Sequence, residues 1–364
     1  MDTAKQFKPD TILLWKKAAD RLEAQRILNM FPSAQVRVIE NQRHQFPQDM
    51  PPGKALLKGK KTLMIGHTSS FVGNFDGRLG ANVCCCPYYK LVPVSNGCPY
   101  YCTYCYLAFV YRKYSPFIKI NINYDTMFRQ IRKVSSNPTG KISFNMGEML
   151  DSFALDHVTN LTPMLIPFFS KLSNSFLMLL TKSSNIDNLL AVTPNEHVIV
   201  SWSLNSEQII HAYELGTAGL AERIAAAKQC QDRGYRIRFR IDPGIIYPNW
   251  QAGYADFIRN ALTSVSPENI TLGMLRLLPG HFRLAEQAYG SRAGKLRHNN
   301  FVKGATDGKL RYTPKQRIEF YTFLIDTIRS FDKKVSISLC RETPEIWLSL
   351  KHLCERRKCN CIVW

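Results

Sequence analysis

From Tyr88 onward, short apolar runs alternate with longer segments in which apolar residues recur with helical spacing. The short runs are typical of buried strands, and the longer segments are typical of helices with one buried face. The expected strands are "YYKLVPV", "KISFNM", "FLMLLTK", "HVIVSWSLN", "RIRFRIDPGII", "NITLGMLRLL" and "KVSISLC". Strands that alternate with helices predict parallel βα units in an α/β domain.

Local chemistry at the segment ends predicts several helix boundaries. Asp125 is expected to be the N-cap of one helix, and Pro163 to occupy the first position of the next. Gly234 is expected to end the helix "GLAERIAAAKQCQDRGY", and Thr313-Pro314 to open another. These signals place a helix after most of the expected strands.

Six or seven βα units in one domain predict a barrel or part of one. We expect residues 1–86 to form an N-terminal extension that begins with an amphipathic segment from Thr11 to Met30. Residues 87–280 would form the barrel core. Residues 281–364 would complete the barrel and end in a cysteine-containing tail.

Polar and reactive residues follow the ends of these strands. Active sites of βα barrels lie at the carboxyl ends of the strands, so these residues are expected to share one site. They are Cys98 to Cys105, Gly147, Glu148, Lys182, Ser203, Asn205 and Asp242.

The charge balance indicates a polyanionic partner. The chain has 48 Lys and Arg against 28 Asp and Glu, a formal net charge of +20 and a pI of about 9.5. Such an excess favours nucleic acid, although a basic, solvated surface would have the same composition.

The N-terminus has no apolar signal segment, and no apolar run approaches the roughly 20 residues that span a bilayer. We therefore expect a cytoplasmic, reducing location and no membrane partner. In that setting, clustered cysteines among the 11 of this chain are read as metal ligands rather than disulfides.

Three cysteines lie in the stretch "SNGCPYYCTYCYLAF", with C-x3-C-x2-C spacing. A structural zinc site usually has four ligands in two separated pairs, whereas this loop supplies Cys98, Cys102 and Cys105. An iron–sulfur cubane held by three thiolates is the better match, and it leaves one iron open for chemistry.

This spacing, followed by Tyr106, resembles the cluster motif of radical S-adenosylmethionine (SAM) enzymes. The resemblance implies a 4Fe-4S cluster whose open iron is chelated by SAM. Reductive cleavage of SAM, fed by an electron donor such as flavodoxin or ferredoxin, then gives a 5′-deoxyadenosyl radical that abstracts hydrogen from the substrate.

A narrower resemblance extends from about residue 13 to residue 345. The tracts "CCCPYYKLVPVSNGCPYYCTYCYL", "LDHVT", "TKSSNIDNLL" and "SLNSEQIIHAYELGTAGLAERIAAA" are similar to the spore photoproduct lyase family. Members of that family are partial (α/β)6 barrels of the TIM type that repair a thymine dimer photoproduct in DNA, so a DNA or RNA substrate is implied here.

The same resemblance implies roles for individual residues. Lys182, Ser203 and Asn205 would lie around SAM, and Asp242 is grouped with them as a cofactor-binding residue at a strand end. Tyr104 and Tyr106 match tyrosines near the radical relay.

The sequence departs from the family at one telling position. Lyases that repair the dimer have a cysteine after the second strand, which donates hydrogen to the product radical. The matching residue here is Glu148. The pair Gly147-Glu148 instead resembles the "GGE" element that binds the SAM ammonium group. A related enzyme with another substrate, or with its hydrogen donor elsewhere, is therefore expected.

Further cysteines precede the first strand, end the last strand and occur in the tail: Cys84, Cys85, Cys86, Cys340, Cys359 and Cys361. If the first and last strands are neighbours, these thiols converge. They could then form a second metal centre, either an auxiliary cluster or a zinc site, or one of them could replace the missing hydrogen donor. They could also be buried apolar residues, which is how we interpret Cys230 and Cys354.

Two basic segments are candidates for contact with an anionic substrate. Arg236, Arg238 and Arg240 alternate along one strand, a costly row inside a barrel unless it is paired or faces an anion. The basic segment 281–312 could follow a phosphate backbone, with Phe301 or Tyr312 stacking on bases, or be a solvated excursion.

Three functions therefore remain open at this point. The first is a radical SAM enzyme related to spore photoproduct lyase that acts on nucleic acid or a nucleotide. The second is a radical SAM enzyme that modifies a peptide or small metabolite. The third is a non-enzymatic, cysteine-rich metal protein that binds nucleic acid.

Overall fold

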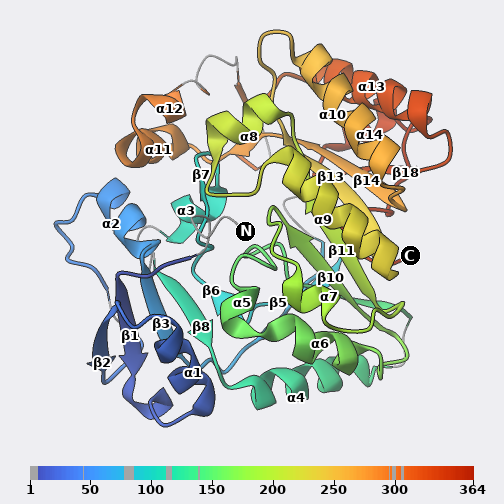
Figure 1. Cartoon of the computed structure of the whole chain (residues 1–364). Coiled ribbons are helices and arrows are strands. Elements are labelled where there is room, and N and C mark those ends of the chain that lie inside the picture. Colours follow the sequence, from blue (N-terminus) through green and yellow to red (C-terminus); the bar gives the residue numbers. More distant parts are fainter. Residues whose placement is uncertain are drawn as a thin grey trace.

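The computed structural model describes residues 7–43, 45–77, 86–111, 117–137, 140–294, 296, 301–304 and 307–364. Its main feature is an eight-stranded sheet in the order β18-β14-β13-β11-β10-β9-β5-β4 (Figure 1). Neighbouring strands from β5 to β18 are parallel, and β4 pairs antiparallel with β5 at one edge. Among the described strands, β4 and β18 are the edges, so the sheet is open rather than closed.

The seven parallel strands of this sheet correspond to the predicted apolar runs, whereas the antiparallel edge strand β4 was not predicted. The strands of the sheet are β4 (Val72–Phe75), β5 (Tyr88–Leu91), β9 (Ile142–Asn145), β10 (Ser175–Thr181), β11 (Val198–Ser203), β13 (Arg236–Gly244), β14 (Asn269–Met274) and β18 (Ser336–Leu339).

Helices connect the parallel strands, because a parallel pair needs a crossover rather than a tight turn. Because of these crossovers, the carboxyl ends of all the parallel strands lie on the same side of the sheet, at the ends of the strands. The helices are α4 (Tyr124–Ser135), α5 (Asp156–Thr159), α6 (Leu161–Phe169), α7 (Asp187–Leu190), α8 (Glu207–Tyr213), α9 (Leu220–Arg233), α10 (Trp250–Ser264), α11 (His281–Tyr289), α12 (Ser291–Gly294), α13 (Pro314–Phe331) and α14 (Pro344–Ser349).

Four predicted helix boundaries have different outcomes. Gly234 ends α9 in the left-handed conformation, and Thr313 caps α13 by accepting a hydrogen bond from the Gln316 amide, both as predicted. The prediction of Asp125 as an N-cap was wrong, because α4 begins one residue earlier and its N-cap is Asn123. Pro163 lies third in α6 rather than first, because Asn160 caps that helix.

The N-terminal residues build a second sheet, in the order β2-β1-β3-β8-β6. The predicted amphipathic segment from Thr11 to Met30 is only partly helical. Its first five residues form the central strand β1, since this apolar run is covered on both faces. The elements are β1 (Thr11–Trp15), a 3-10 turn (Lys16–Ala18), α1 (Leu22–Met30), β2 (Gln35–Ile39), α2 (Pro52–Gly59), β3 (Thr62–Gly66), β6 (Val94–Ser95) and β8 (Ile118–Asn121).

Short elements complete the region around the carboxyl ends of the large sheet. They are β7 (Tyr101–Cys102), α3 (Tyr106–Tyr111), β12 (Glu214–Leu215), β15 (Arg276–Leu277), β16 (Val302–Lys303) and β17 (Leu310–Arg311). Strand β7 pairs with β12, so the cysteine loop is tied to the segment after α8.

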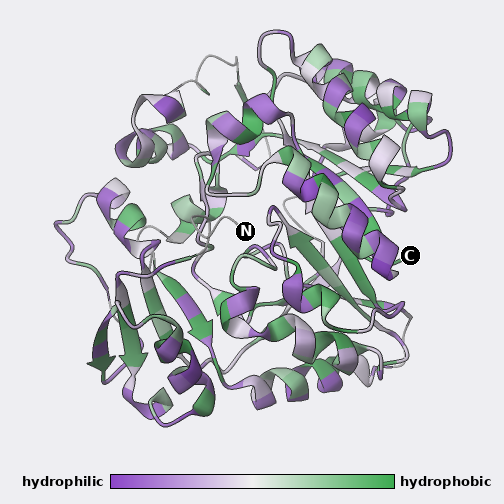
Figure 2. Ribbon diagram, in the orientation of Figure 1, coloured by the Kyte–Doolittle hydropathy of each residue, from purple (hydrophilic) through white to green (hydrophobic). Residues whose placement is uncertain are grey.

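The two faces of the large sheet differ in polarity. One face is apolar and packs on the helices, with Phe144, Val200 and Leu272 fully buried in the main core. The outer helices accordingly show alternating hydrophobic and hydrophilic bands (Figure 2). The other face presents polar side chains, listed here from β9 to β14: Ser143, Asn145, Ser201, Ser203, Arg238, Arg240, Asn269 and Thr271.

The C-terminal tail, residues 355–364, crosses this polar face. Arg238 Nη1 donates to the carbonyls of Cys359 and Ile362, and the Asn360 amide donates to Thr271 Oγ1 at 2.9 Å. At the far end of the tail, the Val363 amide donates to Ser143 Oγ on β9. The predicted row of arginines on β13 is therefore paired inside the protein. In the part of the chain that the structure describes, no helix has the length and apolarity needed to cross a membrane.

Candidate active site

A cavity of about 250 Å³ lies at the carboxyl ends of the parallel strands. It brings together nearly all of the site residues predicted from the sequence. Those that line it are Cys98, Cys102, Tyr104, Cys105, Tyr106, Gly147, Glu148, Lys182, Ser203 and Asp242.

Three predicted residues lie elsewhere. Asn205 is outside the described lining, and its side chain donates to the Pro243 carbonyl and accepts from the Tyr254 hydroxyl. Tyr312 is fully buried, with its hydroxyl accepting from the Ile246 amide, so the prediction that it could stack on a base was wrong. Phe301 is half-buried against Phe282 and Tyr312.

The cysteine loop is held from several sides. The Thr103 amide donates to the Tyr213 carbonyl at 2.9 Å, and His281 Nε2 lies 2.9 Å from the Thr103 carbonyl. The Lys60 ammonium donates to the carbonyls of Cys98 and Tyr100. A loop fixed by this many backbone contacts can present its side chains in a reproducible geometry.

The loop thiols suit an iron–sulfur cluster. Cys98, Cys102 and Cys105 line the same cavity, and all three are free of disulfides. Burial raises the pKa of Cys98 to about 11, so its thiolate needs a cationic partner, which bound iron supplies. These three residues would hold the cluster at the wall of the cavity.

Beneath the loop lies an ionic network centred on Glu214 of β12, in which Glu214 and Arg223 are fully buried. Tyr104 Oη donates to Glu214, and Arg223 Nη2 donates to its other oxygen at 2.6 Å. The Lys182 ammonium lies 3.7 Å from the same carboxylate and donates to Ser203 Oγ at 2.5 Å. The site therefore connects a loop tyrosine to two strand-end residues.

This network sets the protonation of its members. Burial would raise the pKa of Glu214, but Lys182 and Arg223 outweigh burial and lower it. Burial and the adjacent carboxylate together raise the pKa of Tyr104 well above its ordinary value. Tyr104 is therefore a neutral phenol bonded to an ionised carboxylate.

Sequence reasoning missed Glu214 and Arg223. Both occur in the quoted tract "HAYELGTAGLAERIAAA", where they resemble ordinary charged residues near a helix start. The available signal was the pair of opposite charges nine residues apart across Gly216 and Gly219, which permit a tight turn between them.

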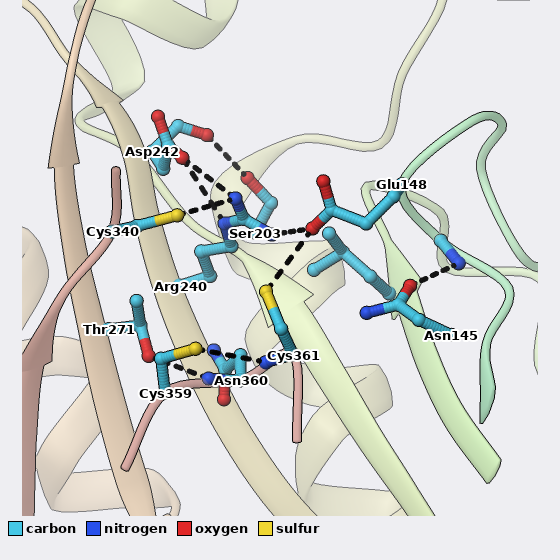
Figure 3. A network of polar contacts seen from close by, with 12 residues as sticks. Asn145, Glu148, Ser203, Arg240, Asp242, Thr271, Cys340, Cys359, Asn360 and Cys361 are labelled. Atoms are coloured by element: carbon cyan, nitrogen blue, oxygen red, sulfur yellow. Dashed lines mark hydrogen bonds and ion pairs between the residues drawn. The ribbon is translucent and has the colours of Figure 1, made fainter. Parts of the chain in front are cut away.

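Glu148 is held by arginines rather than left open to the cavity. Its carboxylate pairs with Arg240 and lies 3.0 Å from Arg341 Nη2. Burial alone would raise the pKa of Glu148, but these two guanidinium groups lower it to about 2. Figure 3 shows Glu148 pointing toward Arg240, with Cys361 on the side of the tail. Glu148, the residue predicted from the sequence to replace the family's donor cysteine, is thus an ionised and paired carboxylate.

Gly147 permits close contact between strands β9 and β10. A Cβ atom at this residue would overlap with Leu180 Cβ and would lie 2.7 Å from the Leu180 amide nitrogen. The glycine is required by this approach, which brings Glu148 to the wall of the cavity.

The rest of the wall is strongly cationic. Asp242 pairs with Arg240 and Arg276, both at 2.9 Å, and these pairs outweigh burial to lower its pKa. The lining has six cationic side chains, Lys60, Lys182, Arg240, Arg276, Lys309 and Arg341, against three acidic ones, Glu148, Asp151 and Asp242. The excess of positive charge favours anionic groups on the molecules that enter.

Tyr106 lies where this cationic wall meets the cysteine loop. The Lys309 ammonium is 5.9 Å from the centre of its ring, and Arg341 hydrogen-bonds to its hydroxyl. Burial raises the pKa of Tyr106, so it also remains a neutral phenol.

Comparison with known proteins agrees with this geometry. The family model of spore photoproduct lyase matches residues 7–299. Spore photoproduct lyase of Clostridium acetobutylicum is 27% identical over 254 residues, 69% of this chain and 73% of that protein. The Bacillus subtilis enzyme is 24% identical over 302 residues, 82% of this chain and 83% of that protein.

Solved structures show the same fold. Spore photoproduct lyase complexed with dinucleoside spore photoproduct superposes with a TM-score of 0.77 at 22% identity, covering 92% of this chain and 98% of that one. A mutant with bound AdoMet and the same ligand gives 0.76 at 22% identity, with the same coverage. The family match covers most of the chain and includes the cysteine loop, so this protein belongs to the spore photoproduct lyase family of radical SAM enzymes.

Proposed function

We propose that this protein abstracts hydrogen from a nucleic acid or nucleotide substrate held in the cationic cavity. The observation that carries the proposal is the shared wall: the three loop cysteines, Tyr104, Tyr106 and six cationic side chains line the same cavity. Phosphate groups are the anions that such a wall recognises on nucleic acid. The open parallel sheet behind it is interpreted as the family's partial (α/β)6 barrel.

Cys98, Cys102 and Cys105 would hold the cluster, and Lys182, Ser203 and the Gly147-Glu148 turn would line the SAM site. When bound and reduced, the cluster and SAM supply the 5′-deoxyadenosyl radical. The electron would come from a donor such as flavodoxin or ferredoxin, in a reducing compartment such as the cytoplasm. Asn205 would act behind this site, through its bonds to the Pro243 carbonyl and Tyr254.

Tyr104 and Tyr106 are placed to pass on a radical. Oxidation of a neutral phenol releases its proton, and Glu214 already accepts the hydrogen bond of the Tyr104 hydroxyl. Glu214 is ionised and can take this proton without rearrangement. We therefore assign Glu214 as the proton acceptor of Tyr104, with Arg223 and Lys182 compensating its charge.

The last step of the reaction, the return of a hydrogen atom to the product radical, takes place without a thiol at residue 148. A paired carboxylate offers no hydrogen atom to a carbon radical, so Glu148 instead holds Arg240 and Arg341 in the wall. The final hydrogen atom comes either from the Tyr106 hydroxyl or from 5′-deoxyadenosine. In the first case the Tyr106 radical takes an electron from Tyr104 and a proton from solvent, while the Tyr104 proton passes to Glu214.

A second metal centre is also proposed for this protein. Cys340, Cys359 and Cys361, together with Cys86, lie on the side of Arg240 and Glu148 away from the cavity. Cys84 and Cys85, the other residues predicted for this centre, lie outside the described residues.

The substrate class can be tested with reduced, reconstituted protein and SAM in deuterated buffer. Dinucleoside spore photoproduct, undamaged dinucleotide, DNA, RNA and a lysate-derived peptide pool would be compared as substrates. We expect 5′-deoxyadenosine formation to rise with a nucleic acid or nucleotide and the affinity for it to fall steeply with salt. A rise with peptide alone would contradict the proposal. Deuterium in the product would identify an exchangeable donor such as tyrosine, and its absence would identify 5′-deoxyadenosine as the donor.

A further inference from the structure

Four cysteine thiols from three distant segments converge beneath the wall of the cavity. Cys86 precedes β5, Cys340 follows β18, and Cys359 and Cys361 lie in the C-terminal tail. Cys359 Sγ lies 3.1 Å from Cys86 Sγ across 273 residues of sequence, and the Cys361 side chain is in hydrogen-bonding contact with Cys359 and Cys340. The sulfur atoms thus form an unbroken series of contacts.

The path of the chain explains this convergence. Strands β5 and β18 lie at opposite ends of the parallel row and are not neighbours, so pairing of the first and last strands does not bring the thiols together. Instead, the tail crosses the polar face of the sheet. Arg238 and Thr271 fix its backbone, and Cys359 and Cys361 thereby lie between Cys86 and Cys340.

The thiols lie beside hydrogen-bond donors and beside one carboxylate, since Cys361 Sγ donates to Glu148 Oε1 at 3.6 Å. Arg240 Nη2 donates to Cys340 Sγ at 3.1 Å (Figure 3). The Tyr88 hydroxyl packs in the same cluster as Cys359 and Cys361, is buried, and has no hydrogen-bond partner among the described residues. A guanidinium and an unpaired hydroxyl are donors of the kind that surround metal-bound sulfur.

The spacing of the sulfur atoms favours one ion over a cluster. In a tetrahedral zinc site with Zn–S bonds of about 2.3 Å, the sulfur atoms are about 3.8 Å apart. The three sulfur contacts, Cys86–Cys359, Cys359–Cys361 and Cys361–Cys340, would have to open toward that spacing around one ion. A four-iron cluster is several bonds across and would force the tail away from the sheet, where Asn360 donates to the Phe239 carbonyl.

We infer that Cys86, Cys340, Cys359 and Cys361 bind one zinc ion in a closed, structural site made of four thiolates. The ion links the C-terminal tail to the segments next to β5 and β18, the first and last parallel strands of the large sheet. Through Cys340 it also fixes Arg240, which pairs with Glu148 and Asp242 in the wall of the cavity. This site refines the second metal centre of the proposed function, and it has no open position for substrate.

Among the described residues, no group of three or more His, Cys, Asp or Glu side chains is arranged so that it could hold a metal ion as it stands, and this includes Cys98, Cys102 and Cys105. The inference therefore rests on which thiols the fold gathers and on the donors around them.

The test is metal analysis of anaerobically purified protein from cultures supplied with iron and zinc. We expect about one zinc and about four irons per chain. Cys359→Ser/Cys361→Ser should lose the zinc and keep the iron. Cys230→Ser and Cys354→Ser each remove a thiol that belongs neither to the cysteine loop nor to the four-thiol site, and both variants should keep the zinc and the iron. Since zinc is measured without SAM or substrate, its loss or absence is independent of whether the proposed reaction occurs.

Two results would overturn the inference. One is wild-type protein with no zinc above background, whether its iron is near four or near eight per chain. The other is full zinc retention in the double variant. If that variant fails to fold, cobalt(II) bound to the wild-type protein provides the second measurement. A thiolate-to-cobalt charge-transfer band that is lost in Cys86→Ser is expected, and a band unchanged in that variant would contradict the site.

Discussion

The cysteine loop and the C-terminal tail place their cysteines on opposite sides of the ion pair between Arg240 and Glu148. The loop cysteines lie within eight residues of one another and face the cavity. The tail cysteines meet Cys86 and Cys340 only because the tail crosses the sheet, and Arg240 and Glu148 separate them from the cavity. The difference shows that a local motif can bring thiols together by its spacing alone, whereas thiols from distant segments meet only through the fold.

The strongest way to separate the two regions is to remove the loop thiols. Cys98→Ala/Cys102→Ala/Cys105→Ala should lose essentially all cluster iron and the associated absorption, because we propose these residues as the cluster's protein ligands. Iron analysis and visible absorption measure the effect. The matched control is Cys359→Ser/Cys361→Ser, which should retain the iron. Equal iron loss in both variants would show that the two regions form one centre.

Removing the arginine that supports the cysteine loop should lower the free energy of unfolding more than removing the arginine that anchors the tail. Arg223→Met leaves the buried Glu214 carboxylate with only part of its compensation, and we expect a loss of about 3–5 kcal/mol in the free energy of unfolding. Urea denaturation of the variant measures it. Lys228→Met breaks an exposed pair with Asp232 and should cost less than about 0.5 kcal/mol. A similar small loss in Arg223→Met would show that the network does not hold the loop.

The anchoring of the tail can be weakened on its own. Arg238→Met removes two hydrogen bonds to tail carbonyls and the pairing with Glu268, which is partly exposed. We expect a loss of about 2 kcal/mol and faster hydrogen exchange at residues 359–363, with unchanged exchange in the cysteine loop. Hydrogen exchange read by mass spectrometry distinguishes the two regions. Equal acceleration in both would contradict their independence.

The ion pairs of Glu148, which lie between the two regions, should make the stability of the protein depend on pH. The pKa of Glu148 is about 2 in the folded protein, below its ordinary value of 4.5, so its stabilising contribution is complete above pH 4.5 and is lost as the pH falls toward 2. Glu148→Gln should make the decline of stability over this range shallower by up to about 1.4 kcal/mol per pH unit. Urea denaturation at several pH values compares the variant with the wild type. Parallel curves would show that Glu148 is not held by the arginines.

Local sequence predicted the parts of this protein that local forces determine. The apolar runs became strands of the large sheet, and the C-x3-C-x2-C loop lies at their carboxyl ends because its ligands are contiguous. Most strand-end residues reached the cavity for the same reason, since parallel strands end at one edge.

What could not be predicted depends on contacts between distant segments. Tyr312 looked available for stacking, but its ring is buried against Phe301 and its hydroxyl accepts from the Ile246 amide. Asp125 looked like a cap, but α4 begins one residue before it, after Asn123, whose side chain bonds to Thr68. Glu214 could not be recognised as a site residue from the sequence. Its role depends on burial beside Arg223 and Tyr104, and only the fold brings these residues together.

The central claim is that the cluster loop starts radical chemistry in this cavity. Its most direct test is 5′-deoxyadenosine formation from SAM by anaerobically reconstituted, chemically reduced protein. The account predicts 5′-deoxyadenosine from the wild type and from Cys359→Ser/Cys361→Ser, and none above background from the variant without loop thiols. Wild-type protein with its full cluster iron that forms no 5′-deoxyadenosine, with or without nucleic acid, would contradict it.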